Sequence, residues 1–209
     1  MNRITDIHTH HAAPQPEAVV CSSPELFAPV EGQLYSIGIH PWDIPQDISK
    51  VDWEKFLALC SHPQVCAIGE CGIDKAKGGP LFLQMQVLKQ QIEISERLKK
   101  PLVIHDVKAH DIIIGMKKEF RPSQKWVVHG FNGKPSVAKM LIDAGIWLSF
   151  GPRFNPDSVK SVPEMMMLAE TDDSDATIRD VISSLSVVRG TDISDTIALN
   201  ASRFLSQSD

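Results

Sequence analysis

The sequence predicts an α/β protein built as a compact (β/α)8 TIM barrel. Apolar runs closed by polar or glycine residues give about eight strand candidates, helical patterns lie between several of them, and residues of metal-ligand type stand where the runs end. Strands that alternate with helices pair in parallel, and eight such units favour a closed barrel over an open sheet. With 209 residues, the chain is near the lower length limit for this fold.

Each predicted strand is a short apolar run with a polar or glycine residue at its end. The runs are residues 3–8, 18–22, 34–40, 65–70, 101–105, 125–129, 146–150 and 165–170. About ten residues separate the first two runs, whereas a parallel crossover needs about a dozen or more. We therefore expect the first outer helix of the barrel to be shortened or missing.

The predicted helices have apolar residues at helical spacing and recognisable ends. They are residues 53–60, 82–99, 108–120, 135–144, 180–189 and 194–205. Asp52 is available as an N-cap for the first helix, and Pro101 stops the second and starts the next strand. Pro135 stands in the first turn of the fourth helix, and Gly145 lies just past its end.

Composition indicates one soluble globular domain over residues 1–209. The chain is 43% hydrophobic and 22% charged, which supplies enough apolar side chains for one core. Its net charge of -5 argues against a broadly basic surface, so a nucleic-acid substrate would have to be held locally. There is no signal-peptide pattern, no long apolar run and no disulfide-type density of cysteines. We therefore expect a cytoplasmic protein without a membrane span, with reduced cysteines.

His8 and His10 are the first candidate metal ligands. Side chains two positions apart on a strand point the same way, so both imidazoles can bind one ion. Imidazole suits zinc, nickel or iron, while Glu70 and Asp172 offer oxygen ligands that could bridge two ions. The alternative is that the two histidines are ordinary polar residues near a strand end.

Six residues of ligand type stand at or just after the ends of predicted strands, at what would be one end of the barrel. They are His8, His10, Glu70, His105, His129 and Asp172. The active site of such barrels lies at the C-terminal ends of the strands. Buried carboxylates and clustered imidazoles are costly unless something neutralises them. The pattern therefore predicts one or two divalent cations held at the barrel mouth.

Seven segments carry a family resemblance that extends over almost the whole chain. They are DIHTH at 6–10, GIHPW at 38–42, AIGECGID at 67–74, PLVIH at 101–105, HGFNG at 129–133, ETD at 170–172 and NASRF at 200–204. In these motifs and their order, the chain strongly resembles the TatD family of metal-dependent deoxyribonucleases, within the wider amidohydrolase-like barrels. The resemblance implies phosphodiester hydrolysis, with DNA as the substrate.

The resemblance also implies roles for individual residues. His8, His10, His105 and His129 match the family's histidine ligands, and Glu70 matches the carboxylate that can bridge two ions. Asp172 matches the last ligand, which also orients or deprotonates the attacking water, so Asp172 and Glu70 are the expected catalytic residues. The ions would be magnesium, manganese or zinc.

Supporting roles are implied for residues beside these ligands. His40 matches a position that touches substrate or supports the site, although a packed turn residue is an equal alternative, and Asp74 would orient a ligand histidine. Lys75 and Arg153 are candidates for substrate contact, and the cations expected near the mouth are Lys75, Lys77, Lys108, Lys134 and Arg153. Loop charges of this kind are often simply solvated.

The chain departs from the family pattern around the substrate site. Asp106 and Val107 follow His105, where the family usually has Ser-Arg, and Lys75 replaces an aromatic residue. The loop after Asp172 is short and acidic. These differences leave open a hydrolase of a small phosphoester, lactone or amide, and a metal-binding scaffold without turnover. The sequence specifies neither the metal nor the oligomeric state.

Overall fold

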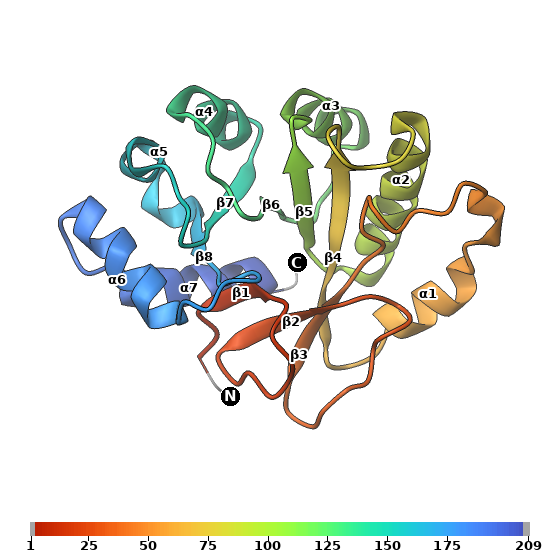
Figure 1. Ribbon diagram of the computed structural model, residues 1–209, viewed down its shortest axis with the longest axis horizontal. Helices are drawn as coiled ribbons and strands as arrows, with labels where there is room; N and C mark the ends of the chain where they lie inside the picture. The colour runs from red at the N-terminus through yellow and green to blue at the C-terminus, as the bar shows by residue number, and fades with distance from the viewer. Residues whose placement is uncertain (1–2, 207–209) are drawn as a thin grey trace.

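The chain forms the expected barrel of eight parallel strands, which alternate with helices on the outside (Figure 1). The computed structural model describes residues 3–206. The strands pair in chain order and are β1 (Asp6–Thr9), β2 (Ala18–Ser22), β3 (Leu34–Ile37), β4 (Val65–Asp74), β5 (Leu102–Val107), β6 (Trp126–Val128), β7 (Ile146–Phe150) and β8 (Met167–Ala169). The predicted fold class is therefore confirmed.

The ring closes between β1 and the residues after β8. Thr9 and Asp172 form a single parallel bridge. The backbone N–H of Asp172 donates to the oxygen of His8 at 3.0 Å, and the N–H of His10 donates to the oxygen of Asp172 at 2.9 Å. The contacts that close the barrel thus lie between three predicted ligand residues.

The six predicted helices are present, with small differences at their ends. The helical elements are η1 (Ile48–Lys50), α1 (Trp53–Cys60), α2 (Leu81–Leu98), α3 (His110–Phe120), α4 (Pro135–Asp143), α5 (Pro156–Ser161), η2 (Glu164–Met166), α6 (Ile178–Arg189) and α7 (Ser194–Leu205). Asp52 caps α1 as expected. A capping box formed by Thr177 and Asp180 starts α6 earlier than predicted. The short α5 was not predicted; the Asn155 side chain caps it.

The first outer helix is missing, as expected, and so is the second. Residues 10–17 and 23–33, all of which the structure describes, connect β1 to β2 and β2 to β3 without a helix (Figure 1). This side of the barrel is consequently covered by loops. Among residues 3–206, no helix is both long and apolar enough to cross a membrane.

Strand β4 does not end at Glu70, as the sequence pattern predicted. Ile68 pairs with Leu102 and Cys71 with Ile104, so β4 contains one extra residue and its register shifts between these pairs. Such a bulge re-aims a side chain without ending the strand, and here it directs Glu70 to the barrel mouth while β4 runs on to Asp74. Strand β3, in contrast, stops before His40.

The barrel interior is filled by apolar side chains below the predicted ligands. This interior cluster consists of Ile7, Ala67, Val103, Val127, Leu168, Ala201 and Phe204. Ala201 and Phe204 belong to α7, which therefore plugs the end of the barrel opposite the ligand residues. A larger core lies between the strands and the outer helices. Because side chains fill the interior and α7 covers one end, the barrel opens at the end where the predicted ligands lie.

Candidate metal centre

The buried Glu70 carboxylate lies at the centre of a ring of imidazoles. Its Oε1 atom is 2.7 Å from Nδ1 of His105, 2.8 Å from Nε2 of His129 and 3.2 Å from Nε2 of His40. These rings come from β5, the residue after β6 and the turn after β3. One carboxylate oxygen thus collects three imidazoles from distant parts of the chain.

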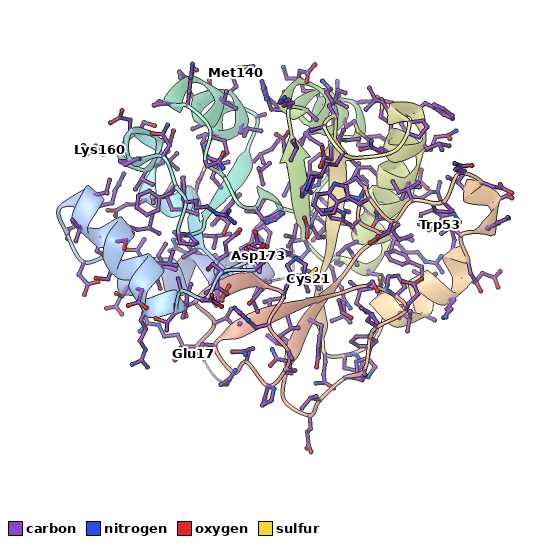
Figure 2. The ribbon with its side chains drawn as sticks, viewed as in Figure 1. Glu17, Cys21, Trp53, Met140, Lys160 and Asp173 are labelled. Atoms are coloured by element: carbon purple, nitrogen blue, oxygen red, sulfur yellow. The ribbon has the colours of Figure 1, made fainter. Side chains whose placement is uncertain are left out.

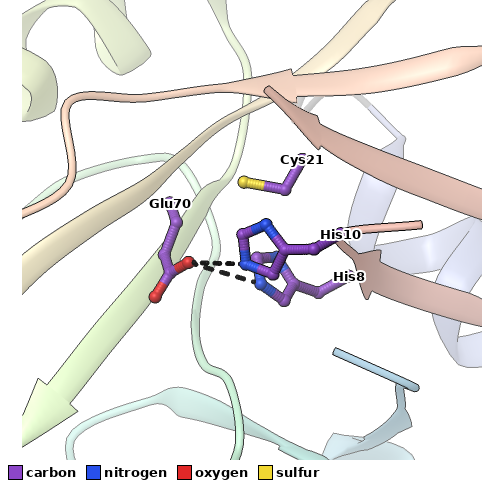
Figure 3. A group of neighbouring side chains, drawn as sticks. All are labelled: His8, His10, Cys21 and Glu70. Carbon is purple, nitrogen blue, oxygen red and sulfur yellow. Dashed lines mark hydrogen bonds and ion pairs between the residues drawn. The ribbon is translucent and has the colours of Figure 1, made fainter. Parts of the chain in front are cut away.

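The other oxygen of Glu70 faces the first pair of histidines. Oε2 is 3.2 Å from Nε2 of His10 and 3.4 Å from Nε2 of His8 (Figure 3). Both of these nitrogens are also 3.6 Å from Oδ1 of Asp172. The two rings lie edge to face with their centroids 4.9 Å apart, so they point the same way, as the strand alternation predicted. The structure therefore brings all six predicted ligands into one cluster, with Glu70 at its centre and Asp172 beside His8 and His10.

His105 is held from its other side by Asp74. Oδ2 of Asp74 is 3.3 Å from Nε2 of His105 and accepts a hydrogen bond from the indole N–H of Trp42 at 2.6 Å. Burial raises the pKa of Asp74, but hydrogen bonds from Trp42, the backbone of residues 76–77 and His105 prevail and lower it to about 2. An ionised Asp74 fixes the ring orientation of His105.

Glu170, for which the sequence motifs predicted no role, makes a similar contact with His129. Its Oε1 atom accepts from the backbone N–H of Gly130 at 2.6 Å and lies 3.2 Å from Nδ1 of His129. Glu170 is fully buried. The available signal was a carboxylate directly after the apolar run of β8, where a buried charge requires a partner.

Asp6 is a second buried carboxylate near the cluster for which the sequence motifs predicted no role. It accepts from the hydroxyl of Thr171 at 2.7 Å and from the backbone N–H groups of Thr171 and His8 at 3.2 Å each. Burial raises the pKa of Asp6 to about 7, although the hydrogen bonds from Thr171 oppose this. Asp6 thereby ties β1 to the segment that carries Asp172.

Charge within the cluster is concentrated on a carboxylate and an imidazole. Burial opposes ionisation of Glu70, but the charge of His129 and hydrogen bonds from three histidines hold its pKa well below the ordinary value. Burial likewise opposes protonation of His129, but Glu70 and Glu170 raise its pKa well above the ordinary value. In the absence of a metal ion, a proton on His129 therefore balances part of the negative charge.

The donors are arranged so that an ion fits among them. Three groups have ligand atoms within 4.8 Å of one another: His8, His10, Cys21 and Glu70; His8, His129 and Asp172; and His40, Glu70 and His105. His8 is fully buried, and neither of its ring nitrogens has a hydrogen-bond partner among the described residues. An unpartnered buried nitrogen is costly, and a metal ion would satisfy it.

A cavity of about 1160 Å³ opens from the cluster to solvent. It extends over the loop after β2 and across to the start of α1, and its wall includes the labelled residues Cys21 and Asp173 of Figure 2. The cations in its wall are Lys50 and Lys55, and the acidic residues besides the cluster include Glu25, Asp43 and Asp52. The cavity is thus large enough for a substrate, but its charge is mixed.

The cations expected at the mouth are not in the cavity wall. Lys75 pairs with Asp111 on α3 at 3.0 Å, and Arg153 pairs with Asp173 at 3.3 Å. Lys77 lies over the ring of Trp42, 4.6 Å from its centroid. The structure therefore does not bring Lys75 and Arg153 to the cluster, whereas His40 and Asp74 contact it directly.

Comparison with known proteins identifies the family. The sequence pattern described as TatD related DNase matches residues 23–202. The chain belongs to this family. A metal-dependent hydrolase of Bacillus subtilis, YabD, is 30% identical over 146 residues, which cover 66% of this chain and 57% of that protein. Human deoxyribonuclease TATDN3 is 30% identical over 156 residues, covering 66% of this chain and 57% of that protein. The chain thus spans somewhat over half the length of the curated relatives it matches.

Solved structures of other TatD proteins have the same fold. The YJJV protein of Escherichia coli superimposes with a TM-score of 0.77 at 21% identity, over 97% of this chain and 96% of that chain. A TatD family hydrolase from Entamoeba histolytica gives a TM-score of 0.79 at 13% identity, over 97% of this chain and 98% of that chain. At these identities the likeness establishes the barrel shared by the TatD family.

Proposed function

We propose that this chain is a divalent-metal-dependent hydrolase that cleaves phosphodiester bonds in DNA with a metal-activated water. The observation that carries the proposal is the position of Glu70, whose two oxygens face two different sets of imidazoles. Membership of the TatD-related DNase family supports it. The name of the human relative, a deoxyribonuclease, favours DNA as the substrate.

The donor atoms form two sets that share Glu70. Oε2 of Glu70 would act with His8, His10 and Asp172, and Oε1 with His105 and His129. One or two ions can be held in this way. A majority of imidazole donors favours zinc over magnesium and manganese, which prefer oxygen ligands.

The residues would share the work of hydrolysis. A bound divalent ion makes a coordinated water more acidic and stabilises charge on the phosphate. Asp172 is 30% exposed and borders the cavity, so its carboxylate can orient the attacking water and accept a proton from it. Because its pKa is held well below the ordinary value, Glu70 is a weak base, and its role would be to hold metal. His40 borders both the cavity and Oε1 of Glu70, where it can contact the scissile phosphate.

The charge of the cavity favours a second candidate, a hydrolase of a small phosphoester, lactone or amide. Lys75 and Arg153 are engaged by acidic partners, and Asp106 follows His105 where a cation would assist phosphate binding. Of the cationic side chains in residues 3–206, a long anionic strand would meet Lys50 and Lys55 in the wall. A small ester would not need an extended basic track.

Turnover assays with a matched pair of variants separate these candidates. The purified protein is first analysed for metal, then assayed on labelled single-stranded DNA and on chromogenic phosphodiesters, lactones and amides, with and without chelator. Asp172→Asn should abolish turnover, while Asp175→Asn, in the same loop but outside the cavity wall, should retain it. Chelator-sensitive cleavage of DNA supports the first proposal, and cleavage of small esters alone supports the second. Absence of bound metal, or activity indifferent to chelator, would contradict both.

A further inference from the structure

Cys21, on β2, points its sulfur into the cluster of the predicted ligands. Its Sγ atom and the nearest donor atoms of His8, His10 and Glu70 all lie within 4.8 Å of one another. Figure 3 shows the sulfur above the two imidazole rings, on the same side of the Glu70 carboxylate as those rings. Cys21 also lines the cavity. The Oε2 side of Glu70 therefore has a soft sulfur donor next to two imidazoles.

His8 provides an independent sign that these four side chains surround a ligand. It is fully buried, its Nε2 atom faces Glu70 at 3.4 Å, and neither ring nitrogen has a hydrogen-bond partner among residues 3–206. A buried imidazole without a partner costs free energy unless an ion or another group occupies the space it faces. That space is the one into which Cys21 points.

The environment of Cys21 differs from that of the other cysteines. The thiols of Cys60, Cys66 and Cys71 each lie within hydrogen-bond distance of a backbone carbonyl oxygen, at 4.0, 3.4 and 3.5 Å. Cys21 has no such carbonyl partner among the described residues. The Cys21 sulfur therefore lacks the acceptor that each of the other three thiols has.

We propose that Cys21 is a metal ligand of the Oε2 side of Glu70, together with His8 and His10, and that it makes this side selective for a thiophilic ion such as zinc. The inference rests on the proposed metal centre and extends it. On coordination, the S–H bond of Cys21 breaks, the proton leaves to solvent and a sulfur lone pair binds the ion, without any change of oxidation state. Thiolate favours zinc or cobalt over magnesium and manganese.

Cobalt(II) substitution tests the sulfur ligand directly. Bound cobalt gives visible ligand-field bands with any protein donors, whereas a sulfur-to-cobalt charge-transfer band in the near ultraviolet requires a thiolate. We expect both in the wild type, and we expect Cys21→Ser to keep the visible bands but lose the charge-transfer band. Cys66→Ser is the matched control and should keep both. Zinc affinity of Cys21→Ser should fall about tenfold or more, on the scale of changes around metal ligands, with manganese affinity unchanged.

The outcomes separate this inference from the proposed function. Visible bands without charge transfer in the wild type, or a charge-transfer band that survives in Cys21→Ser, would overturn the role of Cys21 and leave the metal centre standing. No cobalt spectrum at all in the wild type would overturn the metal centre and this inference with it. X-ray absorption of the zinc-loaded wild type needs no variant: it should contain a sulfur neighbour at about 2.3 Å, and a shell of nitrogen and oxygen alone would refute the proposal.

Discussion

Oε1 of Glu170 lies 3.2 Å from Nδ1 of His129, while Nε2 of the same ring lies 2.8 Å from Glu70. The imidazole is thus held between two carboxylates, one at the cluster and one behind it. With its proton on Nδ1, His129 can donate a hydrogen bond to Glu170, and its Nε2 atom then faces the proposed metal centre. A carboxylate behind a ligand imidazole fixes its tautomer and raises its basicity.

Glu170→Gln should weaken metal binding without unfolding the protein. Glutamine retains an acceptor for Gly130 and His129 but loses the negative charge, so we expect zinc affinity to fall about 10- to 100-fold. Competition with a chromophoric chelator measures the affinity, and circular dichroism checks the fold. Glu164→Gln, at a half-buried ion pair with Arg189 outside the cluster, is the control and should bind zinc normally. Equal affinities in both variants would refute the role of Glu170.

Replacement of His8 by leucine should remove most of the stabilisation that bound zinc gives to the folded protein, without destabilising the metal-free protein. In the metal-free protein the substitution removes a fully buried imidazole with no hydrogen-bond partner among residues 3–206, so the free energy of unfolding should stay equal or rise by about 1 kcal/mol. The wild type should gain about 2.7 kcal/mol at zinc concentrations of about 100 times Kd, and His8→Leu should gain much less. Urea unfolding with and without zinc measures both effects. A large loss of stability in the metal-free variant would contradict this account.

DNA binding should depend on the lysines in the cavity wall. Lys50 and Lys55 are exposed there, whereas Lys75 and Arg153 lie outside the wall and pair with Asp111 and Asp173. Replacing both wall lysines by alanine should weaken binding of single-stranded DNA and reduce the salt slope by about 1.4, or about 0.7 for each phosphate contact. The Lys75→Ala and Arg153→Ala pair should change the slope little. Fluorescence anisotropy at several salt concentrations measures the slope. A smaller slope in the Lys75 and Arg153 pair, with no change in the Lys50 and Lys55 pair, would contradict DNA binding along this wall.

Two glycines should respond to alanine in opposite directions. A Cβ at Gly72, on β4 at a φ of +148°, would overlap the backbone oxygen of His105, so Gly72→Ala should destabilise the protein by about 3 kcal/mol or more. Gly115 is exposed within α3 and has open space around it. Gly115→Ala should therefore stabilise the protein by about 0.5 to 1 kcal/mol. Denaturant midpoints at constant slope test both, and equal effects would contradict the strand packing described here.

Lys117 should make stability depend on pH above neutrality. Burial lowers the pKa of Lys117 to about 8, although Glu96 opposes this, while the unfolded value is about 10.4. Between these values the unfolded chain binds more protons than the folded one, so stability should rise with pH. The wild type should gain about 1 kcal/mol relative to Lys117→Met between pH 7 and 10, after allowance for partial exposure. The control Lys118→Met, at an exposed position, should follow the wild type. If the difference in free energy of unfolding between the wild type and Lys117→Met does not change with pH, the lowered pKa of Lys117 is contradicted.

Local sequence patterns were sufficient for the elements of the barrel. Alternation of apolar runs and helical periods located the eight strands and six of the helices, because these patterns reflect burial on one face of each element. Ends that depend on other parts of the chain were less well predicted. The extra residue in β4 is defined only by pairing with β5, so the sequence pattern ended that strand at Glu70 although it continues to Asp74.

The sequence by itself determined which residue types stand at the barrel mouth, including both histidines of the first strand and the carboxylates at 70 and 172. Only the tertiary structure decided which oxygen of Glu70 meets which imidazole, and it alone revealed Cys21 and Glu170 beside the cluster. The reason is physical. Periodicity specifies the direction of a side chain relative to its own strand, whereas distances between strands depend on register, bulges and ring closure, which arise from contacts between residues far apart in the chain.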